Sequence, residues 1–196
     1  MKSLITGLLI SSSLMLLTGT VHASTLASGE RLEVKVDPKK VGEETAALWQ
    51  RFGAWCAIAE WHPAVKKCEE TREGGAIFRT LTLGNGVKIK EKLIDQTSTS
   101  YRYAIVESPL PVKNFEAQFS VTPDDDAVNI VWSATYDAAD GKTEKDARLL
   151  VDGSFKHALT NIKAKLADKA AGKPVILDCA RYMPTAGITV AVPCDQ

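Results

Sequence analysis

Residues 76–136 decide the fold, and they read AIFRTLTLGNGVKIKEKLIDQTSTSYRYAIVESPLPVKNFEAQFSVTPDDDAVNIVWSATY. Five segments of this stretch alternate apolar and polar side chains: 77–83, 87–94, 101–107, 114–121 and 128–136. This alternation is typical of strands that bury one face. Turn-forming sequences rich in Gly, Pro, Asn and Asp separate the segments. Because no connection between the five segments is long enough for a helix, the stretch predicts a curved antiparallel sheet with one face buried from water.

The buried face of this predicted sheet is not purely aliphatic. Successive residues of a strand point to opposite faces, so Arg79 and Glu91 are expected on the inside with the apolar residues. Large aromatic residues share that face: Tyr101, Tyr103, Phe115, Phe119, Trp132 and Tyr136. This composition favours the lining of a ligand pocket over a tight aliphatic core.

The N-terminus has the pattern of a secretory signal peptide. Lys2 supplies a positive charge, residues 4–17 are mostly apolar, and Val21-His22-Ala23 has the small-residue spacing that precedes cleavage. The apolar run is short and serine-rich, so we do not expect it to span a membrane. We predict cleavage after Ala23 and a periplasmic or secreted protein.

The charge balance gives no support to nucleic-acid binding. The 196 residues include 24 Lys and Arg and 24 Asp and Glu. Lys2 is the only Lys, Arg, Asp or Glu in residues 1–23. Removal of this segment leaves 23 basic and 24 acidic residues, a net charge of about −1. The remaining chain, 196 minus 23 or 173 residues, has a single-domain length. Without a basic patch, an uncharged small partner fits better.

Four cysteines lie beyond the predicted cleavage site: Cys56, Cys68, Cys179 and Cys194. An even number in an exported protein predicts two disulfides, and four cysteines allow three pairings. We prefer Cys56 with Cys68 and Cys179 with Cys194, since both pairs are close in sequence. No Cys-x-x-Cys spacing is present, so we expect neither a metal nor a cofactor.

The flanking segments complete an α+β order. We expect a strand at 31–36, a helix at 38–53, a short helix at 55–60, a strand at 65–71, a long helix at 143–170 and two short strands within 175–196. Asp37-Pro38 suits a helix start. The aspartate side chain can cap the N-terminus of the helix, and proline at the first helical position loses no hydrogen bond, because the N–H there has no partner within the helix. The long helix has an apolar stripe: Val151, Phe155, Ala158, Ile162 and Leu166. We expect this stripe to cover the sheet and leave a cavity between them.

The sequence resembles the polyketide cyclase/dehydrase-like branch of the START and birch-pollen-allergen-like superfamily, also called SRPBCC. The matching motifs are Trp61-His62-Pro63-Ala64-Val65, Gly75 to Arg79 with Leu81 and Leu83, Glu91-Lys92-Leu93, Tyr101 with Tyr103, Pro109-Leu110-Pro111-Val112, Asn114-Phe115 and Val131 to Tyr136. The resemblance implies a helix-grip domain at 24–172, with about seven strands wrapped around the long helix. The disulfide-linked tail at 173–196 departs from that domain.

Arg79 and Glu91 lie on adjacent predicted strands, and two interpretations of the pair are open. The guanidinium is suited to bind a carboxylate, enolate or phosphate of a ligand, with Glu91 orienting it. Alternatively, the two residues form a structural ion pair that contacts no ligand.

His62 also has two interpretations. Its imidazole is suited to acid–base chemistry near neutral pH, or it is a packing residue beside a ligand-binding Trp61. Tyr101, Tyr103, Trp132 and Tyr136 are expected to stack on a planar ligand or to pack in the core. His157 lies off the apolar stripe, and we expect it in solvent.

The resemblance implies a cavity for a hydrophobic or amphipathic small molecule, and our first hypothesis is binding without turnover. The alternative is a cyclase- or dehydratase-like enzyme, in which Arg79 and a tyrosine stabilise an enolate while His62 or Glu91 moves a proton. A third hypothesis comes from similarity to exported accessory proteins of methanol oxidation in methylotrophs. There the 173–196 tail would dock a periplasmic dehydrogenase.

Overall fold

The computed structural model describes residues 25–171, 179–183 and 188–192, and side chains for residues 25–168. The predicted signal peptide and Cys194 lie outside the described residues. Within the described part of the chain, no helix is both long and apolar enough to cross a membrane.

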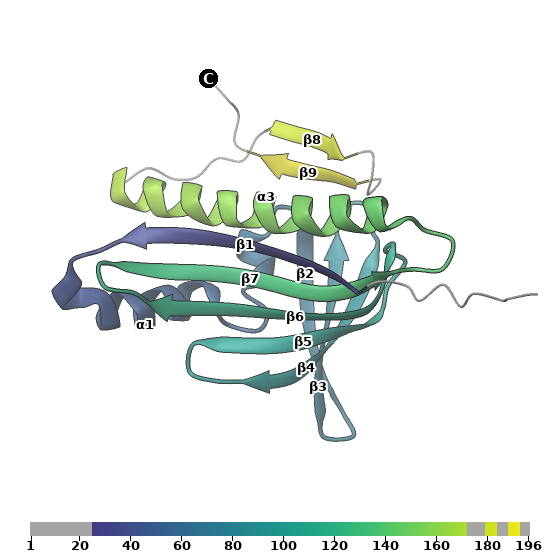
Figure 1. Ribbon diagram of the computed structural model, residues 1–196, viewed down its shortest axis with the longest axis horizontal. Coiled ribbons are helices and arrows are strands. Elements are labelled where there is room, and N and C mark those ends of the chain that lie inside the picture. The colour runs from purple at the N-terminus through teal and green to yellow at the C-terminus, as the bar shows by residue number, and fades with distance from the viewer. Residues whose placement is uncertain (1–24, 172–178, 184–187, 193–196) are drawn as a thin grey trace, which may run out of the picture.

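Seven antiparallel strands form one curved sheet (Figure 1). In sheet order they are β1 (Leu26–Lys35), β7 (Ala127–Ala138), β6 (Val112–Pro123), β5 (Ser100–Glu107), β4 (Lys88–Gln96), β3 (Ala76–Leu83) and β2 (Val65–Glu73). The predicted five-strand meander is confirmed as β3 to β7, in which each strand pairs with the next. β1 pairs with β7 and so brings the first strand to the last.

β1 begins at Leu26, five residues earlier than the strand predicted at 31–36. Leu26 is 1% exposed, and the Oγ atom of Ser28 lies 2.6 Å from the hydroxyl of Tyr136. The early part of β1 therefore pairs along β7 even though its Ala-Ser-Gly sequence lacks clear alternation.

The α-helices pack against the sheet, and they are α1 (Val41–Phe52), α2 (Ile58–Trp61) and α3 (Glu144–Ala171). The short 3-10 helix η1 (Pro38–Lys40) leads into α1 and buries no residue. The carboxylate of Asp37 accepts a hydrogen bond from the Lys39 amide at 2.9 Å, as expected of a cap. Thr143 caps α3 by accepting from the Asp146 amide at 3.1 Å. α3 runs along β1 and also contacts β7 (Figure 1).

The second short helix covers Ile58–Trp61 instead of the predicted 55–60. Residues 54–57 form bends and turns, and Cys56 in this segment is bonded to Cys68 of β2. The Cys56–Cys68 disulfide that we preferred is thus present. It attaches the segment before α2 to the edge strand of the sheet.

The tail contains the two predicted short strands, β8 (Cys179–Met183) and β9 (Ile188–Val192), which pair antiparallel. The predicted partner of Cys179 in the second disulfide, Cys194, is not among the described residues, so that pairing stays a prediction.

Aromatic side chains from α1, α2 and the loop between them fill one part of the concave face. Trp61 stacks on Phe119, with ring centroids 5.2 Å apart, and Trp55 contacts the edge of Tyr101 at 5.1 Å. α3 covers the neighbouring part, where Phe155 stacks on Trp132 at 4.3 Å. Val151, Phe155, Ala158 and Ile162 of the predicted stripe are buried. A cavity remains between these two packed regions.

Candidate functional site

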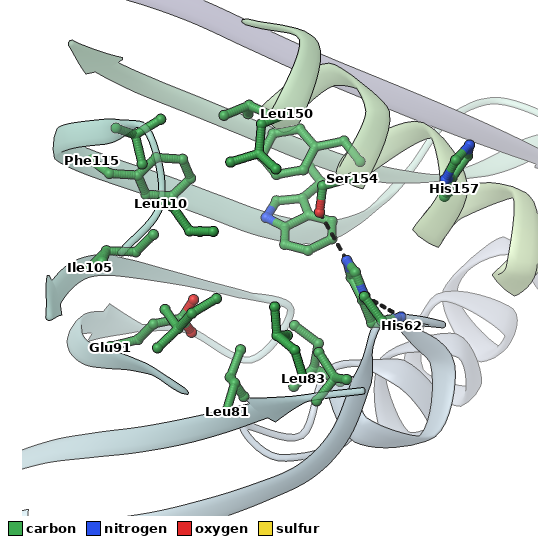
Figure 2. Close-up of a pocket in the computed structure, with 18 of the residues that line it drawn as sticks. His62, Leu81, Leu83, Glu91, Ile105, Leu110, Phe115, Leu150, Ser154 and His157 are labelled. Carbon is green, nitrogen blue, oxygen red and sulfur yellow. Dashed lines mark hydrogen bonds between the residues drawn. The ribbon is translucent and has the colours of Figure 1, made fainter. Parts of the chain in front are cut away.

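A cavity lies between the inner face of the sheet, the α2–β2 segment and α3 (Figure 2). Its volume is about 90 Å³, below the roughly 300–1,000 Å³ of pockets for drug-sized molecules. Its walls are mostly aliphatic and aromatic, including Leu81, Leu83, Ile105, Leu110, Phe115 and Leu150. An apolar interior of this size suits a small apolar molecule, because burial removes its surface from water.

Polar groups of the lining lie in separate parts of the cavity. In Figure 2, Glu91 lies on one side, and His62 with Ser154 lies on the other, with Leu81 and Leu83 between them. Each of these polar groups has a protein partner, and those partners decide what it offers to a bound molecule.

Glu91 and Arg79 face each other across β3 and β4, as predicted. The Nε atom of Arg79 donates to Oε2 of Glu91 at 2.5 Å, and both side chains are buried. Burial raises the pKa of Glu91 above its usual range, and the nearby guanidinium offsets this only in part. Burial alone would lower the pKa of Arg79, but Glu91 and two tyrosines outweigh it and raise that pKa. Arg79 is therefore a permanent cation.

Arg79 does not line the cavity. Its guanidinium carbon lies 3.8 Å from the ring centre of Trp55 and 5.0 Å from that of Tyr103. Its Nη1 atom donates to the carbonyl of Trp55, and the side chain has no exposed surface. The guanidinium thus packs in the protein interior, where its Nη2 atom is buried without a hydrogen-bond partner among the described residues, whereas Glu91 lines the cavity.

His62 follows α2, and its ring is held by two hydrogen bonds. The Ala64 amide donates to Nδ1 at 3.2 Å, and Nε2 lies 3.0 Å from the Oγ atom of Ser154 on α3. Because Nδ1 accepts, the proton of the neutral ring is on Nε2, which donates to Ser154. Burial, followed by the charges of Arg79 and His157, lowers the pKa of His62 to about 4.

The Ser154–His62 contact has the separation of a nucleophile and its base, but the opposite polarity. A general base needs a free lone pair on the nitrogen facing the serine hydroxyl. Here that nitrogen carries the proton, and the other nitrogen is occupied by a backbone amide. The pair therefore orders the wall of the cavity and does not activate Ser154.

Tyr103 and Trp132 form a third polar contact at the cavity. The indole Nε1 of Trp132 donates to the Tyr103 hydroxyl at 3.0 Å. Burial, and then the Glu91 charge, raises the pKa of Tyr103 well above its ordinary value. The phenol is therefore neutral, and its own proton is left to donate.

The structure brings five of the predicted ligand-binding residues to the cavity: His62, Glu91, Tyr103, Phe115 and Trp132. The other four are outside its lining: Trp61, Arg79, Tyr101 and Tyr136. Trp61 donates to the Phe52 carbonyl at 3.0 Å, and Tyr136 contacts Ser28. Tyr101 is 1% exposed and packs between Trp49 and Trp55. The inner face is thus divided between aromatic packing and cavity.

The sequence predicted that α3 closes the cavity, and Val151 and Phe155 of the expected stripe line it, but three further residues of α3 were missed. Leu150, Ser154 and His157 all line the cavity. The expectation that His157 lies in solvent is wrong, since its ring borders the cavity and its Nδ1 is buried. These residues flank the apolar stripe, and helical periodicity alone does not show that the stripe is wide enough to include them.

The described residues contain no group of three or more His, Cys, Asp or Glu side chains able to hold a metal ion. The polar groups that line the cavity include a carboxylate, a phenol, a serine hydroxyl, the neutral imidazole of His62 and the ring of His157. Such groups orient a molecule by hydrogen bonds.

Comparison with known proteins supports the same fold. The family described as "Polyketide cyclase / dehydrase and lipid transport" matches residues 39–167. The comparison with curated proteins gave no match.

Solved structures of similar shape come from several bacteria. An uncharacterised protein from Bacillus thuringiensis is 22% identical, covers 73% of this chain and 100% of its own, and has a TM-score of 0.61. The protein XoxI from Bacillus cereus is 23% identical over 74% of this chain and 97% of its own, with a TM-score of 0.62. The Zhui aromatase/cyclase from Streptomyces sp. R1128 is 14% identical over 77% of this chain and 100% of its own, with a TM-score of 0.55.

At these identities the solved structures show the fold alone. The seven-stranded sheet closed by a C-terminal helix is the helix-grip architecture that the resemblance implied. The match over residues 39–167, about two thirds of the chain, establishes that the chain belongs to the polyketide cyclase/dehydrase and lipid-transport family.

Proposed function

We propose that this protein binds a small hydrophobic or amphipathic molecule in the cavity beneath α3 and does not turn it over. The observation that carries this proposal is the apolar cavity itself, closed on one side by Leu150 and Phe155 of α3. A folded protein normally fills its interior to close packing. An apolar space bordered by a few oriented polar groups is the usual form of a small-molecule site.

The contacts of the polar groups favour binding over catalysis. The enzyme hypothesis needs Arg79, Glu91 and His62 to meet at one ligand atom. Arg79 is outside the lining, and Glu91 and His62 lie on different sides of the cavity. His62 also lacks a free lone pair for proton abstraction.

The Cys56–Cys68 disulfide supports an extracytoplasmic location, because structural disulfides persist in oxidising compartments. We therefore include export in the proposal, with cleavage after Ala23. Mass spectrometry of the protein recovered from the periplasm or medium tests it. A mature mass that retains residues 1–23 would contradict it.

Native mass spectrometry of the protein, purified without denaturation, tests ligand binding directly. We expect an adduct of a small apolar compound, which extraction then identifies. Leu150→Trp should abolish the adduct, because Leu150 lines the cavity and is 6% exposed. Leu149→Trp is the matched control, since the neighbouring Leu149 is 45% exposed and outside the lining.

Overpacking a buried site can destabilise a protein by roughly 1–3 kcal/mol, so circular dichroism must show that Leu150→Trp is folded. A wild-type protein without any adduct would count against the proposal. So would a folded Leu150→Trp variant that carries the same adduct as Leu149→Trp.

A further inference from the structure

One oxygen of the Glu91 carboxylate has no hydrogen-bond partner in the described part of the chain. Oε2 accepts from Arg79, whereas Oε1 accepts no hydrogen bond from the residues that the structure describes. The fully buried polar atoms that lack a partner among the described residues do not include Oε1. Oε1 therefore keeps some accessible surface. Since Glu91 is only 4% exposed and lines the cavity, the space that Oε1 faces is the cavity.

The backbone at Glu91 is irregular. The pairing of β4 with β5 shifts register between Lys90, which faces Glu107, and Glu91, which faces Ile105. The extra residue is Val106 of β5. Bulges re-aim side chains and are frequent beside binding sites. In Figure 2 the Glu91 side chain lies between those of Ile105 and Leu81.

The charge at this end of the cavity is already balanced. Arg79 forms an ion pair with Glu91, with 2.5 Å between Nε and Oε2, and does not itself line the cavity. A bound cation would add an unpaired buried charge, which is unfavourable in an apolar interior. A bound anion would share the cavity with the Glu91 carboxylate, which lines it, and the two like charges would repel each other. A neutral hydrogen-bond donor fits both the charge and the free acceptor.

We propose that the molecule in this cavity is uncharged and donates a hydroxyl, or a similar neutral O–H or N–H, to Oε1 of Glu91. This inference rests on the proposed binding function and names the ligand class. It reverses the expectation that Arg79 receives a carboxylate, enolate or phosphate. Tyr103 also lines the cavity, and its hydroxyl accepts from Trp132 and keeps its own proton to donate to a bound molecule.

A set of four probes on one aromatic body tests the inference: toluene, p-cresol, benzoate and benzylammonium. Binding is measured at pH 7 by calorimetry and by Trp fluorescence, since Trp132 borders the cavity. A buried hydroxyl without an acceptor would make p-cresol bind more weakly than toluene. With the carboxylate as acceptor, we expect p-cresol to bind about tenfold more tightly than toluene and both ions to bind more weakly than p-cresol.

A double variant shows which residue provides the acceptor. Arg79→Met/Glu91→Leu removes the pair without leaving an unpaired charge, and it should bring p-cresol to the affinity of toluene or below. The matched control is Arg72→Met/Glu70→Leu, which makes the same two changes at an exposed ion pair of β2. The control should retain the preference for p-cresol.

The outcomes separate the two proposals. Binding of toluene as tightly as p-cresol by the wild-type protein would overturn the inference and leave the binding function standing. Tighter binding of benzoate or benzylammonium than of p-cresol would overturn it as well, as would a preference for p-cresol that survives in the Arg79→Met/Glu91→Leu variant. If none of the four probes binds and the purified protein carries no adduct, both proposals fail.

Discussion

Replacing Arg79 with methionine leaves the Glu91 carboxylate buried without its cation. Glu91 is 4% exposed, and its Oε2 atom loses a donor at 2.5 Å. The carbonyl of Trp55 loses its donor from Arg79 as well. Methionine has a similar length and fills much of the same volume, so the loss is mainly electrostatic. We therefore expect a large decrease in the free energy of unfolding.

Two estimates give the size of this decrease in the free energy of unfolding. Removing one partner of a buried ion pair costs about 3–5 kcal/mol in other proteins. Glu91 can instead take up a proton. At pH 7, neutralising a glutamate whose ordinary pKa is about 4.3 costs roughly 3.7 kcal/mol, at about 1.36 kcal/mol per pH unit. Both estimates predict a loss of about 4 kcal/mol at pH 7.

The second estimate also predicts the pH dependence. In the Arg79→Met variant the pKa of Glu91 is raised further in the folded state, so the folded state holds a proton that the unfolded state releases. Such a group stabilises the fold most below the unfolded pKa and loses that effect as pH rises. The difference in stability between wild type and variant should therefore shrink as pH falls from 7 towards about 4.3.

Urea unfolding followed by circular dichroism measures these free energies. Arg72→Met removes one partner of an exposed ion pair with Glu70 and is the control, with an expected change within about 0.5 kcal/mol. Arg79→Met/Glu91→Leu should recover most of the loss, because an apolar pair often replaces a buried ion pair without penalty. A loss below about 1 kcal/mol for Arg79→Met, or a double variant as unstable as the single one, would refute the reasoning.

Two further predictions concern His62 and the disulfide. The pKa of His62 is about 4 in the folded state and about 6.5 in the unfolded state. As pH falls, the His62 imidazole is therefore protonated in the unfolded state before it is protonated in the folded state. Stability should therefore fall by about 3 kcal/mol between pH 6.5 and 4. Urea titrations across this range should show a shallower fall for His62→Gln, and an unchanged slope would contradict the assignment. Cys56→Ser/Cys68→Ser opens a loop with a sequence separation of 12, and we expect thermal unfolding to show a loss of roughly 3 kcal/mol. No change in melting temperature would argue against a structural role.

The sequence predicted the sheet well because its signals are local. Alternation assigns each strand residue to one face, and turn residues mark where each strand ends. The inward positions of Arg79, Glu91 and Tyr103 followed from this rule and are confirmed by their burial. The pairing of Arg79 with Glu91 also followed, because a short turn between neighbouring strands leaves few registers open.

The chemistry of the cavity was less predictable because it depends on contacts between distant elements. No local sequence pattern shows that the Arg79 guanidinium donates to the carbonyl of Trp55, which is next to the Cys56–Cys68 disulfide in sequence. The tautomer of His62 depends on Ser154, which is 92 residues away in sequence.

By itself, then, the sequence determined which side chains enter the interior, since strand and helix periods are properties of neighbouring residues. Only the tertiary structure decided which of them pack against each other and which face open space. The concave face is shared between the aromatic side chains around Trp55 and Trp61 and the helix α3, and their packing sets where the cavity lies. Glu91 lines that cavity and Arg79 does not, because the guanidinium packs on the Trp55 ring and donates to the Trp55 carbonyl.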